Sequence, residues 1–430
     1  MKNIDSSRKL ALIIVVLFFL SMVFYIFFAK ENPKEDIKEE GVFEDSKTIP
    51  EGIGVHIYGQ PTDHEFQLMK DAGVKWARFD LAWTLIENEK GIYDFSSPGF
   101  DNIVAKLKKY GIKPYFILAY SNSLYEKKRS IVTDEGRTAY SNFVMAATKR
   151  YKDQGAIWEI WNEPNLPYYW QDQPSYSDYV LLVKRVASVI KESDHTGIIV
   201  APAVSGISGK SLEWFKEVFS QGILEDIDAV SVHPYRVTNP ETVVVDYNNL
   251  KNIISKYTNK PVPILSGEWG YHVKNSNNLE NGELNQAKDI IRMLLVNHSK
   301  GIPISILYEW KNSGDDSNNM HDNYGLMWDE NKPKSSYYAL KAFSSILSGY
   351  SFKEKIEVGQ RDDYILKFSN SEGKQVIVFW TTGPNHYLSL NYPSGKGKLI
   401  SILGEKQEIE WNQDQLSLKL SGSPCYLIIE

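Results

Sequence analysis

Two glutamates each end a short apolar run beside tryptophan, and they are the first candidates for chemistry. Glu163 lies in the motif WNEPN (residues 161–165), and Glu268 lies in the motif SGEWG (residues 266–270). A charged side chain is seldom buried unless it is paired or functional. Cleavage of a glycosidic bond needs two carboxyl groups, one as an acid and one as a base or nucleophile. A salt bridge could explain either glutamate alone, but the two together favour a catalytic pair.

The segments around these glutamates must bring them together, and their pattern is that of repeated βαβ units. Short apolar runs alternate with longer segments of helical period. The predicted strands are Gly52–Ile57, Trp76–Leu81, Pro114–Ala119, Ile157–Trp161, Ile198–Ala201, Ala229–His233, Pro263–Ser266 and Ile304–Tyr308. The predicted helices are Asp63–Asp71, Phe100–Tyr110, Arg137–Lys152, Ser177–Lys191, Ser211–Ser220, Asn248–Tyr257, Leu284–His298 and Ser335–Leu347.

Eight such units predict a (β/α)₈ (TIM) barrel over residues 51–348. A doubly wound open sheet is the alternative, but the glycine-rich phosphate loop typical of one does not follow an early strand. In a barrel, catalytic residues stand at the carboxyl ends of the strands. Glu163 and Glu268 end the fourth and seventh strands, so we expect them to face each other across the barrel mouth. From residue 349 to 430 the apolar period switches to two, which predicts a small antiparallel β-sandwich.

The N-terminal region predicts the compartment. Residues 10–29 form a 20-residue stretch without a charge, long enough to cross a hydrocarbon core of ~30 Å. Basic residues within residues 1–9 favour a cytoplasmic N-terminus, which places the rest of the chain outside. We therefore expect a single-pass signal-anchor in the cell membrane and a charged tether over residues 30–50. The alternatives are secretion after cleavage of a signal peptide and, for the tether, a helix packed on the domain.

Composition excludes several classes of protein. The 430-residue chain has a formal net charge of −6, which argues against nucleic acid as a partner. Its one cysteine, Cys425, excludes an intramolecular disulfide and a cysteine-rich zinc site. The Asp- and Asn-rich loop at residues 315–322 lacks the glycine and terminal glutamate of a calcium-binding loop. We therefore predict no metal, no cofactor and a monomer.

The two glutamate motifs also carry a family resemblance. WNEPN after a fourth strand, with GEWG about a hundred residues later, resembles the retaining glycoside hydrolases of clan A, most of all family 39 and next family 5. Residues 324–326 and 332–340 are similar to the segment that those enzymes carry between strand eight and the last helix. The resemblance covers roughly residues 51–348. It implies that Glu163 is the acid/base and Glu268 the nucleophile.

The same resemblance implies roles for five further residues. Asn162 matches the asparagine that binds the sugar 2-hydroxyl, and Arg78 matches the arginine that holds the nucleophile. His233 and Tyr235 match a pair near the nucleophile. Trp310 matches the tryptophan platform beneath the sugar at the cleavage point. Without the resemblance, ion pairing for Arg78 and core packing for His233 and Trp310 are open alternatives.

Position alone adds weaker candidates. His56, Trp83 and Tyr120 follow strands and are predicted to contact substrate, although ordinary loop packing is an alternative for each. Asp80 is expected to support the site by hydrogen bonding. Glu159, four residues before the proposed acid, is interpreted as structural.

These observations predict a retaining hydrolase that cleaves an extracellular or cell-surface polysaccharide, with endo-acting cleavage favoured because a tethered enzyme faces a polymer. An exo-glycosidase such as a β-xylosidase is one alternative. A non-catalytic polysaccharide-binding or export protein is another. Transfer to a sugar acceptor instead of water would use the same residues.

Overall fold

The computed structural model describes residues 39–273 and 279–430 of the chain. The predicted signal-anchor at residues 10–29 and the first part of the predicted tether lie outside the described residues. Among the helices of the described part, none combines the length and the apolar character that crossing a membrane requires.

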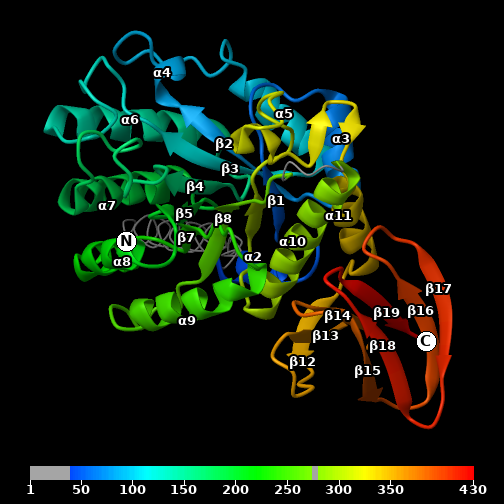
Figure 1. The fold of residues 1–430 in the computed structure, drawn as a ribbon. Helices are drawn as coiled ribbons and strands as arrows, with labels where there is room; N and C mark the ends of the chain where they lie inside the picture. Colours follow the sequence, from blue (N-terminus) through cyan, green and yellow to red (C-terminus); the bar gives the residue numbers. More distant parts are fainter. Residues whose placement is uncertain (1–38, 274–278) are drawn as a thin grey trace, which may run out of the picture. The chain divides into compact units, whose positions relative to one another are not determined.

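The first half of the fold is a parallel sheet that curves into a barrel (Figure 1). Its strands are β1 (Ile53–His56), β2 (Trp76–Ala82), β3 (Lys113–Ala119), β4 (Ile157–Ile160), β5 (Ile198–Val200), β6 (Val204–Ser205), β7 (Val230–His233), β8 (Ile264–Trp269) and β9 (Ser305–Leu307). The sheet order is β5-β4-β3-β2-β1-β9-β8-β7-β6. A bridge between Val200 and Ala229 joins β5 to the start of β7. The two ends of the sheet therefore meet, as in the predicted (β/α)₈ barrel.

The fifth strand position is split into two pieces. β5 pairs with β4 on one side, whereas β6 pairs with β7 on the other. Residues 201–203 interrupt the strand between them. The nine strands thus occupy the eight positions that the sequence predicts.

Helices surround the parallel strands. They are α3 (Asp63–Asp71), α4 (Trp83–Ile86), α5 (Phe100–Tyr110), α6 (Asp134–Tyr151), α7 (Tyr176–Ser193), α8 (Lys210–Ser220), α9 (Val243–Ile254), α10 (Leu279–Ser299) and α11 (Ser335–Ile346). Three short 3₁₀ helices lie at Ile223–Glu225, Pro240–Thr242 and Met320–Asn323, and a small hairpin joins β10 (Met327–Asp329) to β11 (Lys332–Pro333). All eight predicted helices are present, with ends shifted by up to five residues. α3 shows a local cause, because Thr62 and Glu65 form a reciprocal capping box at its start.

The end of the predicted tether is folded. Helix α2 spans Glu39–Asp45. Phe43 is buried in a cluster with Trp76, Tyr115 and Leu265, residues that fill the barrel interior at its amino-terminal end. Ile49 is also fully buried. Residues 43–49 therefore follow the alternative interpretation, a helix packed on the domain, and not the solvated tether.

The C-terminal part is antiparallel, as the period-two pattern predicts. Its strands are β12 (Ser351–Lys355), β13 (Asp363–Ser369), β14 (Gln375–Thr381), β15 (His386–Asn391), β16 (Gly395–Ile400), β17 (Lys406–Trp411), β18 (Gln415–Leu420) and β19 (Cys425–Ile429). Six form one sheet in the order β12-β13-β14-β19-β16-β17, and β15 pairs with β18. These strands enclose an apolar core of their own around Ile377 and Leu418. The indole of Trp380 donates a hydrogen bond to Glu241 at 2.6 Å, which ties β14 to the helical layer of the barrel.

Candidate active site

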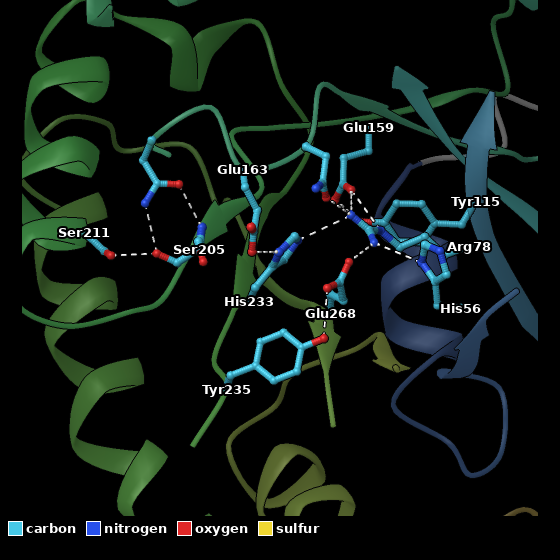
Figure 2. Close-up of polar contacts among 12 residues, drawn as sticks. His56, Arg78, Tyr115, Glu159, Glu163, Ser205, Ser211, His233, Tyr235 and Glu268 are labelled. Carbon is cyan, nitrogen blue, oxygen red and sulfur yellow. Dashed lines mark hydrogen bonds and ion pairs between the residues drawn. The ribbon is translucent and has the colours of Figure 1, made fainter. Parts of the chain in front are cut away.

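Arg78 is the centre of a buried network at the carboxyl end of the barrel (Figure 2). It comes from β2, and its side chain is completely buried. Its Nε and Nη2 donate to Glu159 Oε1 at 2.9 and 2.5 Å. Nη2 also donates to Asn162 Oδ1 at 2.7 Å, and Nη1 donates to Glu268. Arg78 thus holds the predicted nucleophile, and Glu159 is the buried counter-charge that anchors Arg78.

Glu268 is held as an ionised acceptor. One of its carboxylate oxygens accepts from Arg78, and the other accepts from the Tyr235 hydroxyl at 2.9 Å. Burial alone would raise the pKa of Glu268. Electrostatic interactions with His233, Arg78 and His56, together with the Tyr235 hydrogen bond, outweigh burial and lower that pKa to about 2. A carboxylate with this environment stays charged at neutral pH, as a nucleophile must.

Glu163 follows β4 in an uncommon backbone conformation. Its φ is 47°, in the left-handed region that non-glycine residues seldom adopt. Its backbone N–H donates to the carbonyl of Ala203 at 3.0 Å, which holds the conformation. Strained backbone of this kind gathers at functional sites, where it fixes a side chain in one direction. The direction here is toward His233 and Glu268 (Figure 2).

His233 connects Glu163 to Arg78. Its Nε2 lies 3.4 Å from Arg78 Nη2, and its Nδ1 lies 2.9 Å from Glu163 Oε1. Both protons of Arg78 Nη2 are already donated to Glu159 and Asn162, so its contact with His233 Nε2 is a weak one. The hydrogen bond between His233 Nδ1 and Glu163 Oε1 fixes the orientation of that carboxyl group. His233 therefore contacts a catalytic candidate, whereas the alternative was that it only packs in the core.

The two catalytic candidates lie close together. One oxygen of Glu163, one ring nitrogen of His233 and one oxygen of Glu268 all lie within 4.8 Å of one another. This is also the one group of three ligand-type side chains in residues 39–273 and 279–430 with spacing suited to a cation. The Arg78 guanidinium on Glu268 already supplies the positive charge there, and His233 already binds Glu163. The side chains of this group therefore fit catalysis by two carboxyl groups, one ionised and one exchanging a proton, better than metal binding.

A cleft of about 670 Å³ opens above this network. Six of the predicted site residues line it, namely His56, Tyr120, Asn162, Glu163, Tyr235 and Glu268. Arg78 and His233 lie beneath and contact the lining residues. The other lining residues are Tyr58, Asp80, Ile117, Arg129, Tyr168, Tyr169, Arg236, Val237, Tyr308, Met320, His321 and Tyr324. Sequence reasoning missed Tyr58, Arg129, Tyr308 and Tyr324. Tyr58 and Tyr308 closely follow β1 and β9, where such residues can be sought, whereas Arg129 and Tyr324 lie farther along their loops.

Two predicted substrate contacts lie away from the cleft. Trp83 starts α4 and is fully buried, with its ring stacked between Tyr125 and Phe143 and its indole N–H on Glu87. It turns inward because α4 follows directly on β2 and packs against α6.

Trp310 is 2% exposed, and its ring packs on Tyr337. Its backbone pairs with His56 on one side and Met327 on the other, which directs the side chain into the core. Tyr308, two residues earlier, lines the cleft where the tryptophan platform was expected.

Gly267, immediately before Glu268, occupies a space that no side chain fits. A Cβ at this position would lie 2.0 Å from the Ser231 hydroxyl and 3.3 Å from Glu159 Oε2. Gly267→Ala is therefore expected to displace β8 and Glu268, lowering kcat/KM and destabilising the fold by about 1–3 kcal/mol. Thermal unfolding and kinetics measure the two effects. Gly422→Ala is the control, since a Cβ there meets open space, and equal effects from both substitutions would contradict the prediction.

Comparison with known proteins agrees with this geometry. Residues 42–314 match the sequence model of the family "Cellulase (glycosyl hydrolase family 5)". A family 39 glycoside hydrolase from the gut symbiont Bacteroides cellulosilyticus superposes with a TM-score of 0.77 at 26% identity, over 90% of this chain and 82% of that chain. A monomeric β-xylosidase from Caulobacter crescentus shares the fold, with a TM-score of 0.65 at 14% identity over 88% of this chain and 96% of that chain.

Among curated proteins, a 6-phospho-β-glucosidase from Clostridium longisporum is 26% identical over 146 residues. That match spans 30% of this chain and 30% of the relative. The family match is longer and includes both glutamates with the strands that carry them. The chain therefore belongs to the cellulase family of glycosyl hydrolases, family 5, and is a clan A glycoside hydrolase with a structure like those of family 39.

Proposed function

We propose that this protein hydrolyses the glycosidic bonds of a polysaccharide by double displacement, with retention of anomeric configuration. The supporting observation is the spacing of the catalytic candidates, because oxygens of Glu163 and Glu268 lie within 4.8 Å of each other. Retaining enzymes place their carboxyl groups ~5–5.5 Å apart, whereas inverting enzymes leave ~6.5–9.5 Å for a water molecule.

The contacts of Glu268, Glu163 and Asn162 indicate which step of the reaction each residue performs. Glu268 attacks the anomeric carbon, and protonated Glu163 gives its proton to the departing glycosidic oxygen, which leaves a glycosyl ester on Glu268. Glu163, now a carboxylate, then takes a proton from water. That water attacks the anomeric carbon and restores Glu268. Asn162 accepts from Arg78 through its Oδ1, so its NH₂ group remains available to a substrate hydroxyl.

The form of the cleft favours a polymer as substrate. Apolar side chains on two different loops reach the rim, with Tyr168 66% exposed and Val237 92% exposed. Val237 offers apolar surface, and Tyr168 a flat aromatic ring, to sugar units beyond the cleavage point. We therefore infer endo-acting cleavage, with exo-cleavage as in a β-xylosidase as the second candidate. Product lengths distinguish the two, because exo-cleavage releases only short units from one end.

We also propose that the enzyme is monomeric and acts outside the cell, held at the membrane by residues 10–29. The uncharged length of that segment and the basic residues before it support this placement. Fractionation of cells expressing the full chain, with protease added from outside, tests it. The proposal requires a membrane-bound protein that external protease degrades.

The decisive test of the proposed chemistry is the anomeric form of the first product. Proton NMR during cleavage of a β-linked oligosaccharide should show the β-anomer first, with the α-anomer appearing later by mutarotation. An α-anomer formed first would contradict retention and leave an inverting mechanism.

A further inference from the structure

One cation of the cleft has no role in the proposed mechanism. Arg129 lies between β3 and α6 and lines the same cleft as Glu163 and Glu268. The carbon centre of its guanidinium lies 5.0 Å from the ring centroid of Tyr120 and 5.0 Å from that of Tyr168. Two aromatic faces thus hold the side chain in one place. Its backbone is fixed as well, because it exchanges hydrogen bonds with Gln171.

Arg129 differs from its neighbours in forming no ion pair. Lys128, beside it, pairs with Asp172, and Arg236, the other arginine that lines the cleft, pairs with Asp246. Within residues 39–273 and 279–430, no carboxylate lies within ion-pair distance of Arg129. An arginine fixed in a cleft with its N–H groups unpaired is suited to bind a planar anion with two parallel hydrogen bonds.

Asp80 contributes a second unpaired group to the same cleft. It lies on β2 two residues after Arg78, and it lines the cleft without forming a side-chain hydrogen bond in the described structure. Burial, with the nearby carboxylates Glu268 and Glu159, raises the pKa of Asp80 to about 6 against the opposing effects of Arg78 and Arg129. Its carboxyl group is thus open to a sugar hydroxyl, which donates to it.

Charge balance explains why Arg129 matters for substrate choice. The positive charge of Arg78 is already matched by Glu159 and Glu268. An acidic sugar entering beside Glu163, Glu268 and Asp80 would be repelled unless another cation offset them. A neutral glycan, in contrast, would leave the Arg129 guanidinium without an anion.

We propose that the cleft binds a saccharide containing a uronic acid, and that Arg129 binds the uronate carboxylate while Asp80 accepts from a hydroxyl. This inference rests on the proposed glycosidase function and names its class of substrate. Arg129 determines specificity and takes no part in bond cleavage.

Binding to matched oligosaccharides tests the proposal. The full chain carrying Glu268→Gln is titrated calorimetrically with pairs that differ in the carboxylate. The pairs are β-1,4-glucuronic acid oligomers against cello-oligosaccharides, β-1,4-mannuronic acid oligomers against manno-oligosaccharides, and glucuronic-acid-substituted against unsubstituted xylo-oligosaccharides. In at least one pair the acidic member should bind roughly ten- to a hundredfold more tightly, as expected for a charged hydrogen-bonded contact.

Arg129→Gln should abolish that preference, and Arg129→Lys, which keeps the charge without the paired donors, should retain part of it. Lys127→Gln is the control, because it makes the same change of charge on the same loop at an exposed residue outside the cleft lining. The proposal is overturned if no pair is discriminated, or if discrimination survives Arg129→Gln. A preference for sulfated xylo-oligosaccharides alone would overturn the assignment to uronic acids.

Hydrolysis separates this inference from the function on which it rests. If wild type cleaves neutral oligosaccharides as well as acidic ones, the glycosidase function stands and the uronate inference falls. If acidic oligosaccharides bind through Arg129 and wild type cleaves none of them, the inference stands and the proposed function falls.

Discussion

Glu268→Gln is expected to lower kcat by roughly 10⁵- to 10⁶-fold, the loss that follows removal of a catalytic nucleophile. Glutamine preserves the size of the side chain but cannot form the glycosyl ester. Its amide also cannot accept a charged pair of hydrogen bonds from Arg78 and Tyr235 as the carboxylate does. Substrate binding should persist, because the remaining cleft is unchanged. Single-turnover kinetics on an aryl glycoside or oligosaccharide that wild type cleaves measures the loss.

Azide separates this role from that of Glu163. In Glu268→Ala, azide entering the vacated space should restore turnover and give a glycosyl azide of inverted configuration. In Glu163→Ala, kcat should fall by about 10²- to 10⁴-fold for substrates with poor leaving groups. It should fall less for a substrate with a nitrophenyl leaving group, which needs no proton. Azide should then give the retained product. The same azide product from both variants would contradict the assignment of the two roles.

Arg78→Met is expected to have the largest effect on stability. It leaves Glu159 and Glu268 buried without their shared cation, a change that costs about 3–5 kcal/mol in comparable buried pairs. Thermal or chemical unfolding measures this loss. Arg150→Met is the control, since Arg150 pairs with Asp101 at the surface and such pairs contribute about 0–1 kcal/mol. Equal losses would show that Arg78 is not the anchor of the network.

The pH dependence of the same variant gives a second readout. The folded-state pKa of Glu268 is about 2, below its unfolded value near ~4.3. Ionised Glu268 therefore adds stability that is fully present above the unfolded pKa and is lost as pH falls through the folded one. Without Arg78 that pKa rises. Arg78→Met should thus lose activity at a higher pH than wild type on the acidic side of the profile. An unshifted acidic limb would contradict control of Glu268 by Arg78.

Much of the barrel could be predicted because its strands are apolar and regularly spaced. Runs such as Ile157–Trp161 lie in strands buried on both faces, and a helix of clear period follows each. The split of the fifth strand was not predictable, since a short apolar run does not show where backbone pairing stops. The helix at Glu39–Asp45 was obscured by its charged sequence, because its apolar contacts come from two neighbouring residues, Val42 and Phe43.

The catalytic pair was predictable for a different reason: the carboxyl end of a strand is fixed once the strand is found. Residues farther along the loops were harder, because their direction depends on contacts distant in sequence. Trp310 shows this, since pairing with His56 and Met327 turns it away from the cleft. Tyr308 lies in the cleft although it stands only two residues earlier. Residue type alone does not show which of two such aromatic neighbours lines the cleft.

The backbone hydrogen bond between Glu163 and Ala203 has a consequence for how this site can change over evolution. The direction of the proton donor depends on a carbonyl group between β5 and β6, and any amino acid carries a carbonyl. Substitutions in that segment are nevertheless limited, because residues 201–203 are all buried and Ala203 has a positive φ of 53°, which bulky side chains seldom adopt. Insertion or deletion of one residue between Val200 and Val204 would move the carbonyl and misdirect Glu163. The segment is thus expected to keep both its length and its small buried side chains.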